Sequence, residues 1–169
     1  MKRRPIEVIA RGVCVRSGRV LLCHSKGNAN TYLPGGHVEF QEAAAESLRR
    51  EIREELGLKA VVLGFLGAVE HTFVQRGERH CEINLVFEVG IGGVAGARAP
   101  ASREDYIEFL WAGLKDLRKA RLEPWPLCRL LPAWLRRRGS RDAWASTYAI
   151  GKCGVRSAGR ALAGRMDTI

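Results

Sequence analysis

Apolar residues between positions 41 and 56 recur at steps of three and four. Such spacing puts them on one side of a helix, so the pattern predicts a helix with a single buried stripe. The stripe consists of Ala44, Ala45, Leu48, Ile52 and Leu56. Gly57 follows as the expected end of the helix, because glycine readily adopts the left-handed backbone found there. Gly35 and Gly36 are predicted to form the permissive turn that leads into it.

The residues before this helix show the pattern of two strands. β-Branched residues are frequent in 6–15, and Gly18 is expected to turn the chain into a second strand at 20–23, which predicts a hairpin. Arg11 lies within the first of these strands. It is interpreted as a surface charge, and the alternative is a phosphate contact if the side chain faces a cleft.

Further strands are predicted after the helix. The apolar run 60–69 is interrupted by glycines, which is typical of one or two buried strands, and a turn is expected at 75–78. The stretch 81–89 alternates and is predicted as a central strand. The apolar face of that strand consists of Ile83, Leu85, Phe87 and Val89. The polar residues of these strands are interpreted first as cross-strand surface pairs; they are Glu70, His71, Thr72, His80, Glu82 and Asn84.

The last part of the chain contains one loop, one strand and more helix. The Gly/Ala-rich stretch 90–103 has no core pattern and predicts a loop, and the strand after it carries Trp111. A short helix is expected at 115–120. An amphipathic helix follows Pro126, and Pro132 is expected to kink or shorten it. The apolar stripe of that helix is Leu127, Leu130, Leu131 and Trp134.

Composition places the chain among ordinary globular proteins. Its 169 residues fit one domain, with 46% hydrophobic and 27% charged residues, and no apolar run approaches the roughly 18 residues of a membrane span. The five cysteines are odd in number and contain no C-x-x-C pair, which favours reduced thiols. Pro5 and charged residues interrupt the N-terminal apolar positions, so no signal peptide is predicted. We therefore expect a cytoplasmic protein.

The net charge of +10 is concentrated near the end of the chain. The stretch 136–169 contains eight Lys/Arg and two Asp. A basic surface of this kind recruits polyphosphate, nucleotide or RNA. A run of basic residues near a terminus is, however, more often a solvated or poorly ordered tail. We favour the tail for 139–169, and RNA is kept as a partner that the pattern does not favour.

Glu51, Glu54 and Glu55 lie at steps of i, i+3 and i+4 and project from one turn of the predicted helix. Like charges at this spacing destabilise a helix by about 0.2 to 0.5 kcal/mol per pair. A divalent cation would offset this repulsion, and carboxylate oxygens are the ligands that Mg2+ prefers. Arg50 lies one turn before Glu54 and is expected to hold its carboxylate.

The spacing of this segment resembles the signature box of the Nudix hydrolases, G-x5-E-x7-R-E-U-x-E-E-x-G-U, in which U is aliphatic. The matching residues are Gly36, Glu42, Arg50, Glu51, Ile52, Glu54, Glu55, Gly57 and Leu58. A charge run usually marks a solvated helix face, but a full match of residue types and gaps is far more specific. We extend the resemblance to about residues 6–138.

The resemblance implies an α+β fold in which a mixed β-sheet lies between α-helices, with a Nudix domain at 1–138. It also implies a bound Mg2+, with Mn2+ as the alternative metal. The implied ligands are Glu51, Glu54, Glu55 and a backbone carbonyl near Gly35. Glu42 and Arg50 are expected to orient these carboxylates, and Gly36 and Gly57 to be structural.

The implied reaction is hydrolysis of a diphosphate linkage in a nucleoside diphosphate joined to another moiety, with water as nucleophile. Glu54 or Glu104 would accept the proton, and Asp105 is next in order. In a Nudix fold the second pair of strands borders the substrate cleft, so Glu82 and Asn84 are candidates for nucleotide recognition. The expected assembly is a monomer or homodimer.

Two other functions are consistent with the pattern. A Nudix-like module can sense a nucleotide or RNA without cleaving it, although the presence of all three glutamates favours an enzyme. An RNA-directed hydrolase would use the basic stretch 139–169. The base of the substrate and its leaving group lie outside what the box specifies.

Overall fold

The structure is a computed structural model, and it describes residues 5–96, 98–136 and 144–146. These residues form two sheets and two helices, in keeping with the predicted α+β class. The elements are β1 (Glu7–Val13), β2 (Val15–Arg16), β3 (Arg19–Ser25), α1 (Ala44–Leu56), β4 (Ala60–Gln75), β5 (Glu78–Ile91), β6 (Ile107–Gly113), α2 (Leu127–Arg136) and β7 (Trp144–Ser146).

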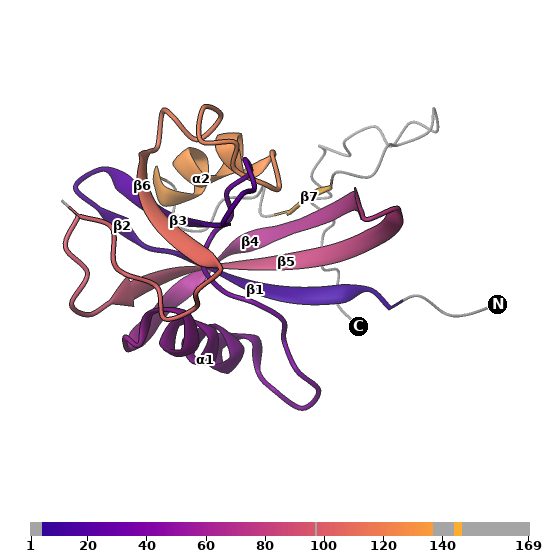
Figure 1. The fold of residues 1–169 in the computed structure, drawn as a ribbon, viewed down its shortest axis with the longest axis horizontal. Coiled ribbons are helices and arrows are strands. Elements are labelled where there is room, and N and C mark those ends of the chain that lie inside the picture. Colours follow the sequence, from indigo (N-terminus) through magenta and orange to yellow (C-terminus); the bar gives the residue numbers. More distant parts are fainter. Residues whose placement is uncertain (1–4, 97, 137–143, 147–169) are drawn as a thin grey trace, which may run out of the picture.

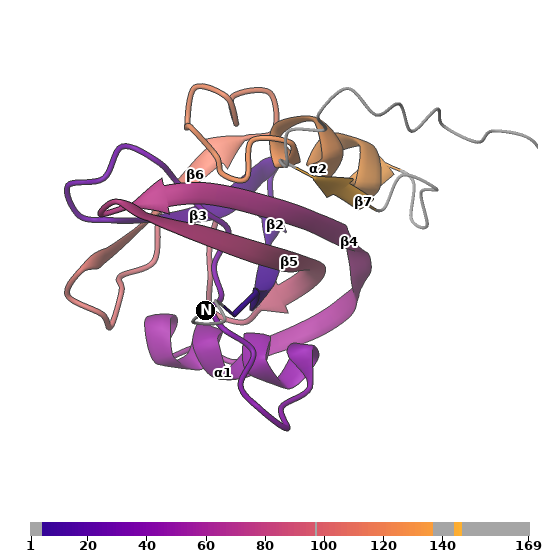
Figure 2. The same cartoon turned by 90° about the vertical axis from the view of Figure 1, so that its right-hand side faces the viewer.

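The strands lie between the two helices. One mixed sheet has the order β1-β5-β4-β7, and an antiparallel sheet has the order β2-β3-β6. Figure 1 shows α1 on one side of these strands and α2 on the other. In the view turned by 90°, the long β4–β5 hairpin passes between the helices (Figure 2). The predicted arrangement of a mixed sheet between helices is confirmed.

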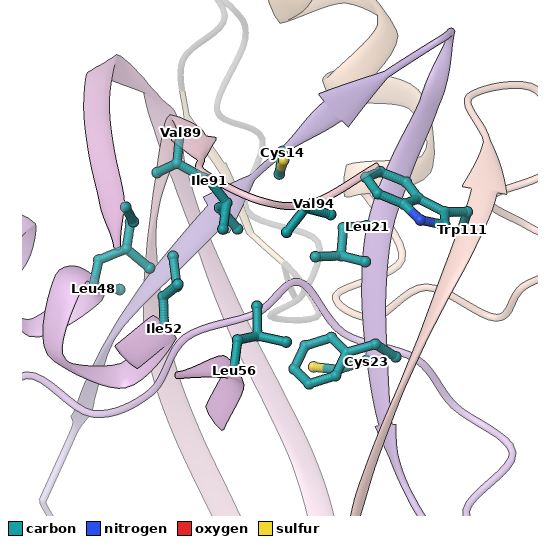
Figure 3. Packing of buried hydrophobic residues seen from close by; sticks show 13 residues of the cluster. Cys14, Leu21, Cys23, Leu48, Ile52, Leu56, Val89, Ile91, Val94 and Trp111 are labelled. Carbon is teal, nitrogen blue, oxygen red and sulfur yellow. The ribbon is translucent and has the colours of Figure 1, made fainter. Parts of the chain in front are cut away.

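Each helix covers its own hydrophobic core. On the α1 side, Leu48 and Ile52 point toward Val89 and Ile91 of β5, and Leu56 lies nearer to Cys23 and Leu21 of β3 (Figure 3). On the α2 side, the stripe predicted from 127 to 134 packs against the other face of the strands. The residues of β3 alternate between the two cores because both faces of this strand are covered.

Helix α1 begins at Ala44, three residues later than the apolar pattern suggests. Gln41 has a φ of 65°, which is left-handed backbone and cannot continue into a right-handed helix. The predicted end is confirmed, because Gly57 has a φ of 68° and its N–H donates to the carbonyl of Arg53 at 2.8 Å.

The predicted N-terminal hairpin is wrong in its pairing. The stretch 6–15 is not one strand: β1 pairs in parallel with β5, from Glu7 with Glu82 to Val13 with Glu88. Only the two residues of β2 pair with β3 across the turn at Gly18. β-Branched residues favour an extended backbone without specifying its partner, so the pattern identified the strand and missed its neighbour.

The β4–β5 hairpin is longer than the sequence suggests. Strand β4 runs for 16 residues as one element, with irregularities in its pairing between Val62 and Gly64 and between Phe65 and Gly67. β-Bulges of this kind bend a strand, which lets one strand border both the α1 core and the cleft. Strand β5 is central as predicted, but Asn84 and Val86, on the face opposite the predicted apolar one, are fully buried.

Three further expectations concern the last part of the chain. The stretch 115–120 forms turns rather than the predicted helix. Helix α2 is confirmed, and it continues for four residues past Pro132. Most of the predicted tail 139–169 lies outside the described residues, and residues 144–146 form β7 beside β4.

Among the described residues, no helix has the length and apolar character needed to cross a membrane.

Candidate active site

The loop before α1 lies along β1, where backbone hydrogen bonds hold it. The N–H groups of Ala10 and Gly12 donate to the carbonyls of Gly36 and Pro34 at 2.9 and 2.8 Å. Gly35 has a φ of 122°, and a Cβ added there would lie 2.1 Å from the carbonyl oxygen of Ala10. Glycine is therefore required at position 35 both for its backbone conformation and for the close approach of β1.

Gly36 is required for a different contact. A Cβ at this position would lie 2.4 to 2.6 Å from the carboxylate atoms of Glu51. The absence of a side chain therefore lets the Glu51 carboxylate lie directly against the loop backbone. The glycine pair at the start of the box and the glutamates at its end thus meet in space.

Arg50 connects three carboxylates with the loop. Its guanidinium donates two hydrogen bonds of 2.9 Å to Glu42, and its Nη1 lies 2.7 Å from Glu51 and 3.2 Å from Glu54. Its Nη2 also donates to the carbonyl of His37 at 3.1 Å. The bond to Arg50 lowers the pKa of Glu42 to about 2, so this carboxylate stays charged. Arg50 therefore holds Glu54, as predicted, and orients Glu42 and Glu51 as well.

Glu55 is the buried member of the acidic face, with only 7% of its surface exposed. The pKa of its carboxyl is raised to about 7, chiefly by burial and to a smaller extent by the nearby charges of Glu51 and Glu104. The charge of Arg11 and the N–H of Gly35, which donates to Glu55 Oε2 at 3.4 Å, act in the opposite direction. Glu51 and Glu104 thus both lie close enough to Glu55 to act on its charge, although Glu104 comes from a different segment. Glu54 is exposed.

The loop that carries Glu104 is attached to the end of α1. The N–H of Arg103 donates to the carbonyl of Glu55 at 2.7 Å, and the hydroxyl of Ser102 donates to the same oxygen at 3.4 Å. The guanidinium of Arg103 lies over Gly57, where a Cβ would come within 2.2 Å of Nε. Gly57 therefore both ends the helix and admits this loop. Asp105 is exposed.

Arg11 faces the cleft, so its interpretation as a surface charge is wrong. Its Nη1 donates to the carbonyls of Gly35 at 2.7 Å and Leu33 at 3.1 Å, and its Nε donates to Asn84 Oδ1 at 3.3 Å. The guanidinium also lies 5.8 Å from the centre of the Tyr32 ring. Parallel pairing of β1 with β5 produces this placement, and the local pattern contains no signal for it.

Glu82 and Asn84 lie on β5 beyond Arg11. Asn84 is fully buried and its Nδ2 donates to Glu82 Oε2 at 3.1 Å. They are not simple surface pairs, because one is buried and the other lines a cleft. Glu82 therefore lies at the cleft, whereas Asn84 lies behind it and contacts Glu82, and a role of either residue in nucleotide recognition stays a prediction.

A cleft of about 860 Å3 is lined by Arg11, Glu51, Glu55 and Glu82, whereas Glu54, Asn84 and Glu104 are not among its lining residues. One end contains Gly35, Gly36, Glu51 and Glu55, and Arg11 lies in the middle. The residues that the pattern did not assign to a cleft are Tyr32, His71, Phe73, Tyr106, Glu123 and Trp125. Their signal in the sequence is weak, since aromatic residues are more often core, and only the structure shows Tyr106 and Trp125 each 60% exposed.

The donor set at the first end of the cleft suits a hard cation. Within the described ranges, no group of three or more His, Cys, Asp and Glu side chains converges closely enough to form a metal site by itself. Glu51 and Glu55 nevertheless line the cleft together with Gly35, and a cation there would offset the cost of a buried charge on Glu55, whose pKa is raised mainly by burial. Mg2+ takes one or two carboxylates, several waters and substrate phosphates, which fits this set.

The fold and the acidic end of the cleft define a Nudix domain. The family model described as NUDIX domain matches residues 4–131, and the chain belongs to that family. It is 43% identical over 88 residues to mutator protein MutT4 of Mycobacterium tuberculosis, a match that covers 50% of this chain and 33% of that protein. It is 32% identical over 106 residues to an ADP-ribose pyrophosphatase of Methanocaldococcus jannaschii, covering 60% and 62%. The matches thus span less than two thirds of either relative.

Solved structures show the same fold. A MutT NUDIX hydrolase from Burkholderia pseudomallei is similar with a TM-score of 0.56 and 26% identity, over 70% of this chain and 97% of that one. The MutT protein from Methanosarcina mazei Go1 is similar with a TM-score of 0.61 and 22% identity, over 83% of this chain and 100% of that one.

Proposed function

We propose that the protein is a Mg2+-dependent pyrophosphohydrolase. It cleaves a diphosphate linkage in a nucleoside diphosphate joined to another moiety, by attack of water on phosphorus. The observation that carries this proposal is the placement of Glu51 and Glu55 along the cleft beside the Gly35–Gly36 backbone, with the charge of Glu104 acting on Glu55. The names of the two relatives, an ADP-ribose pyrophosphatase and a mutator protein, support a nucleotide substrate.

The residues of the cleft have distinct tasks in this reaction. Glu51, Glu54, Glu55 and the Gly35 carbonyl would hold the metal, with Mn2+ as the alternative to Mg2+. When bound, the cation neutralises phosphate charge and lowers the pKa of water. Arg11 adds a fixed positive charge in the middle of the cleft, where the substrate chain passes.

Glu104 is the better candidate for proton acceptor. Glu54 lies 3.2 Å from the guanidinium of Arg50, so its lone pairs are partly engaged. Glu104 lies near Glu55, and the hydrogen bond from its own N–H to Ser102 at 3.0 Å holds its backbone there. A carboxylate is a suitable base once its proton donor is acidified by the cation.

The proposal is tested by phosphate release from a panel of substrates, each with Mg2+ and then with EDTA. The panel contains ADP-ribose, nucleoside triphosphates including oxidised ones, dinucleoside polyphosphates and triphosphorylated RNA, and phosphatase coupling registers monoester products. Metal-dependent release from one class supports the hydrolase and identifies the substrate. No release from any substrate, together with tight nucleotide binding, would support a sensor module instead.

Replacement of Glu54 by Gln tests the assignment of the metal ligands. The amide keeps the size of the side chain and removes its charge, so we expect a fold like the wild type and a loss of hydrolysis of at least about 100-fold. Circular dichroism and phosphate release measure the two effects. Turnover near the wild-type rate in a folded Glu54→Gln protein would contradict the assignment.

The expected cytoplasmic location and the expected monomer or homodimer stay predictions. A nucleotide substrate agrees with the family, whereas an RNA substrate depends on the stretch 139–169, nearly all of which lies outside the described residues.

A further inference from the structure

The second end of the cleft differs chemically from the first. Glu82, Glu123 and Trp125 line it together with His71 and Phe73. The two carboxylates here act on the same neighbours. Burial lowers the pKa of His71 and raises the pKa of Tyr32, and the charges of Glu82 and Glu123 act in the upward direction on both groups. This end therefore repels phosphate and accepts hydrogen bonds. Its ligand must present N–H or O–H donors.

Glu82 is held in a fixed orientation by a chain of hydrogen bonds. Arg11 Nε donates to Asn84 Oδ1 at 3.3 Å, and Asn84 Nδ2 donates to Glu82 Oε2 at 3.1 Å. Asn84 is fully buried, and burying its amide is costly unless both of its ends are bonded, which this chain achieves. The arrangement uses the Asn84 amide to present the Glu82 carboxylate to the cleft as a preorganised acceptor.

The neighbouring aromatic residues favour a planar ligand. The rings of His71, Phe73 and His80 form a continuous stack along the hairpin, with centroid distances of 5.2 and 5.0 Å. Trp125 also lines the cleft and is 60% exposed. A nucleotide base fits such walls better than a sugar does, because its faces are apolar and its donors lie along one edge.

We propose that Glu82 determines base specificity and selects a base that presents two adjacent N–H donors, as guanine does with N1–H and its exocyclic amine. An ionised carboxylate only accepts, and its two oxygens match two parallel donors. Adenine presents an acceptor beside its amine and leaves one oxygen unpaired. Hypoxanthine lacks the amine altogether. This inference rests on the proposed function for the direction of the substrate, with its phosphates at the acidic helix and its base at Glu82.

The experiment measures binding of GMP, IMP and AMP by calorimetry, with Mg2+ present. These ligands contain no diphosphate linkage, so the result does not depend on hydrolysis. We expect wild-type protein to bind GMP at least about 10-fold more tightly than IMP or AMP, the factor for losing one hydrogen bond to a charged group.

The decisive variant is Glu82→Gln. The side-chain N–H of Asn84 must then donate to the amide oxygen of the glutamine. The amide nitrogen of the glutamine therefore takes the place of the other carboxylate oxygen, Oε1 of Glu82. That pattern of acceptor and donor matches adenine, so the GMP-to-AMP preference should fall at least about 10-fold or reverse. Glu88→Gln is the matched control, because Glu88 lies six residues along the same strand and outside the residues that line the cleft. It should leave all three affinities unchanged.

Three outcomes would overturn the assignment of Glu82. Equal affinities of wild-type protein for GMP, IMP and AMP would show that the cleft does not read this edge. An altered preference in Glu123→Gln but not in Glu82→Gln would move the role to Glu123. A loss of GMP binding in Glu82→Gln that disappears with 2′-deoxy-GMP would show that Glu82 binds the ribose. If the substrate panel shows no hydrolysis but the GMP preference depends on Glu82, the proposed reaction fails and the base assignment stands.

Discussion

Gly35 and Gly36 are adjacent, but their missing side chains serve different contacts. A Cβ at Gly35 would meet backbone, the carbonyl of Ala10, whereas a Cβ at Gly36 would meet the movable end of Glu51. The backbone of β1 cannot yield without breaking its pairing with β5. Glycine at position 35 is therefore required for folding, whereas glycine at position 36 is required for the placement of Glu51 in the site.

We predict opposite outcomes for alanine at these two positions. Gly35→Ala should lower the free energy of unfolding by more than about 2 kcal/mol, because it combines a backbone clash with a left-handed φ. Gly36→Ala should cost less than about 1 kcal/mol but lower hydrolysis at least about 10-fold, because Glu51 must move. Denaturant unfolding and phosphate release measure the two quantities. Equal losses of stability would contradict the distinction.

Glu55 makes the stability of the metal-free protein depend on pH. Its pKa in the folded protein is about 7, above the ordinary value of 4.5, so between these values the folded state binds more protons than the unfolded state. Stability is therefore fully present below pH 4.5 and falls as the pH rises through 7, by about 3 kcal/mol for this group. Glu42 acts in the opposite direction and in a lower window, because its pKa is lowered to about 2.

The comparison of wild-type protein with Glu55→Gln in EDTA isolates this effect. The difference in unfolding free energy between the two proteins should change by about 3 kcal/mol from pH 4.5 to pH 7.5, with the variant relatively more stable at the higher pH. A difference that does not vary with pH would mean that Glu55 titrates near its ordinary value. Addition of Mg2+ at pH 7.5 should stabilise the wild type and have a smaller effect on the variant.

At the scale of elements, α1 has two functions, and each of them belongs to a different face of the helix. One face supplies the carboxylates, and the other packs Leu48, Ile52 and Leu56 onto β5 and the strands of the second sheet. The packing face fixes where the carboxylates lie relative to Gly35 and Gly36. Loss of packing should therefore affect the site even though Leu48, Ile52 and Leu56 do not line the cleft.

Ile52 offers a test of this link. It is fully buried, so Ile52→Ala should lower the free energy of unfolding by about 2 to 5 kcal/mol, and Ile52→Val by about 0.5 to 1.5 kcal/mol. We expect the valine variant to keep its hydrolytic rate within about 2-fold. A large loss of activity in Ile52→Val with little loss of stability would show that α1 positions its carboxylates less rigidly than this packing implies.

At the scale of the molecule, the whole chain has a net charge of +10, although several glutamates line its cleft. Much of the positive charge belongs to the stretch 136–169. Truncation after Gly139 should leave hydrolysis of small nucleotides within about 2-fold if the cleft alone binds them. Cleavage of triphosphorylated RNA should fall and lose its salt dependence if the basic stretch recruits RNA. Equal rates for full-length and truncated chains on RNA would remove the RNA-directed function.

Features within one turn of helix were predictable from the sequence. The apolar stripe of α1, the acidic face and the end at Gly57 follow from steps of three and four residues, and the structure confirms them. The start of α1 was not predictable in this way, because the left-handed backbone at Gln41 depends on the path of the loop along β1. The same limit explains the wrong partner for the first strand.

The sequence by itself determined the family, the fold class and the carboxylates of the box, because these depend on residues close together in the chain. Only the tertiary structure decided that Arg11 faces the cleft, that Glu55 is buried beside Glu104, and that Asn84 orients Glu82. Arg11 and Asn84 are 73 residues apart, and they meet because β1 pairs with β5. Local periodicity specifies which face a side chain occupies, whereas the groups it meets there depend on which strands pair.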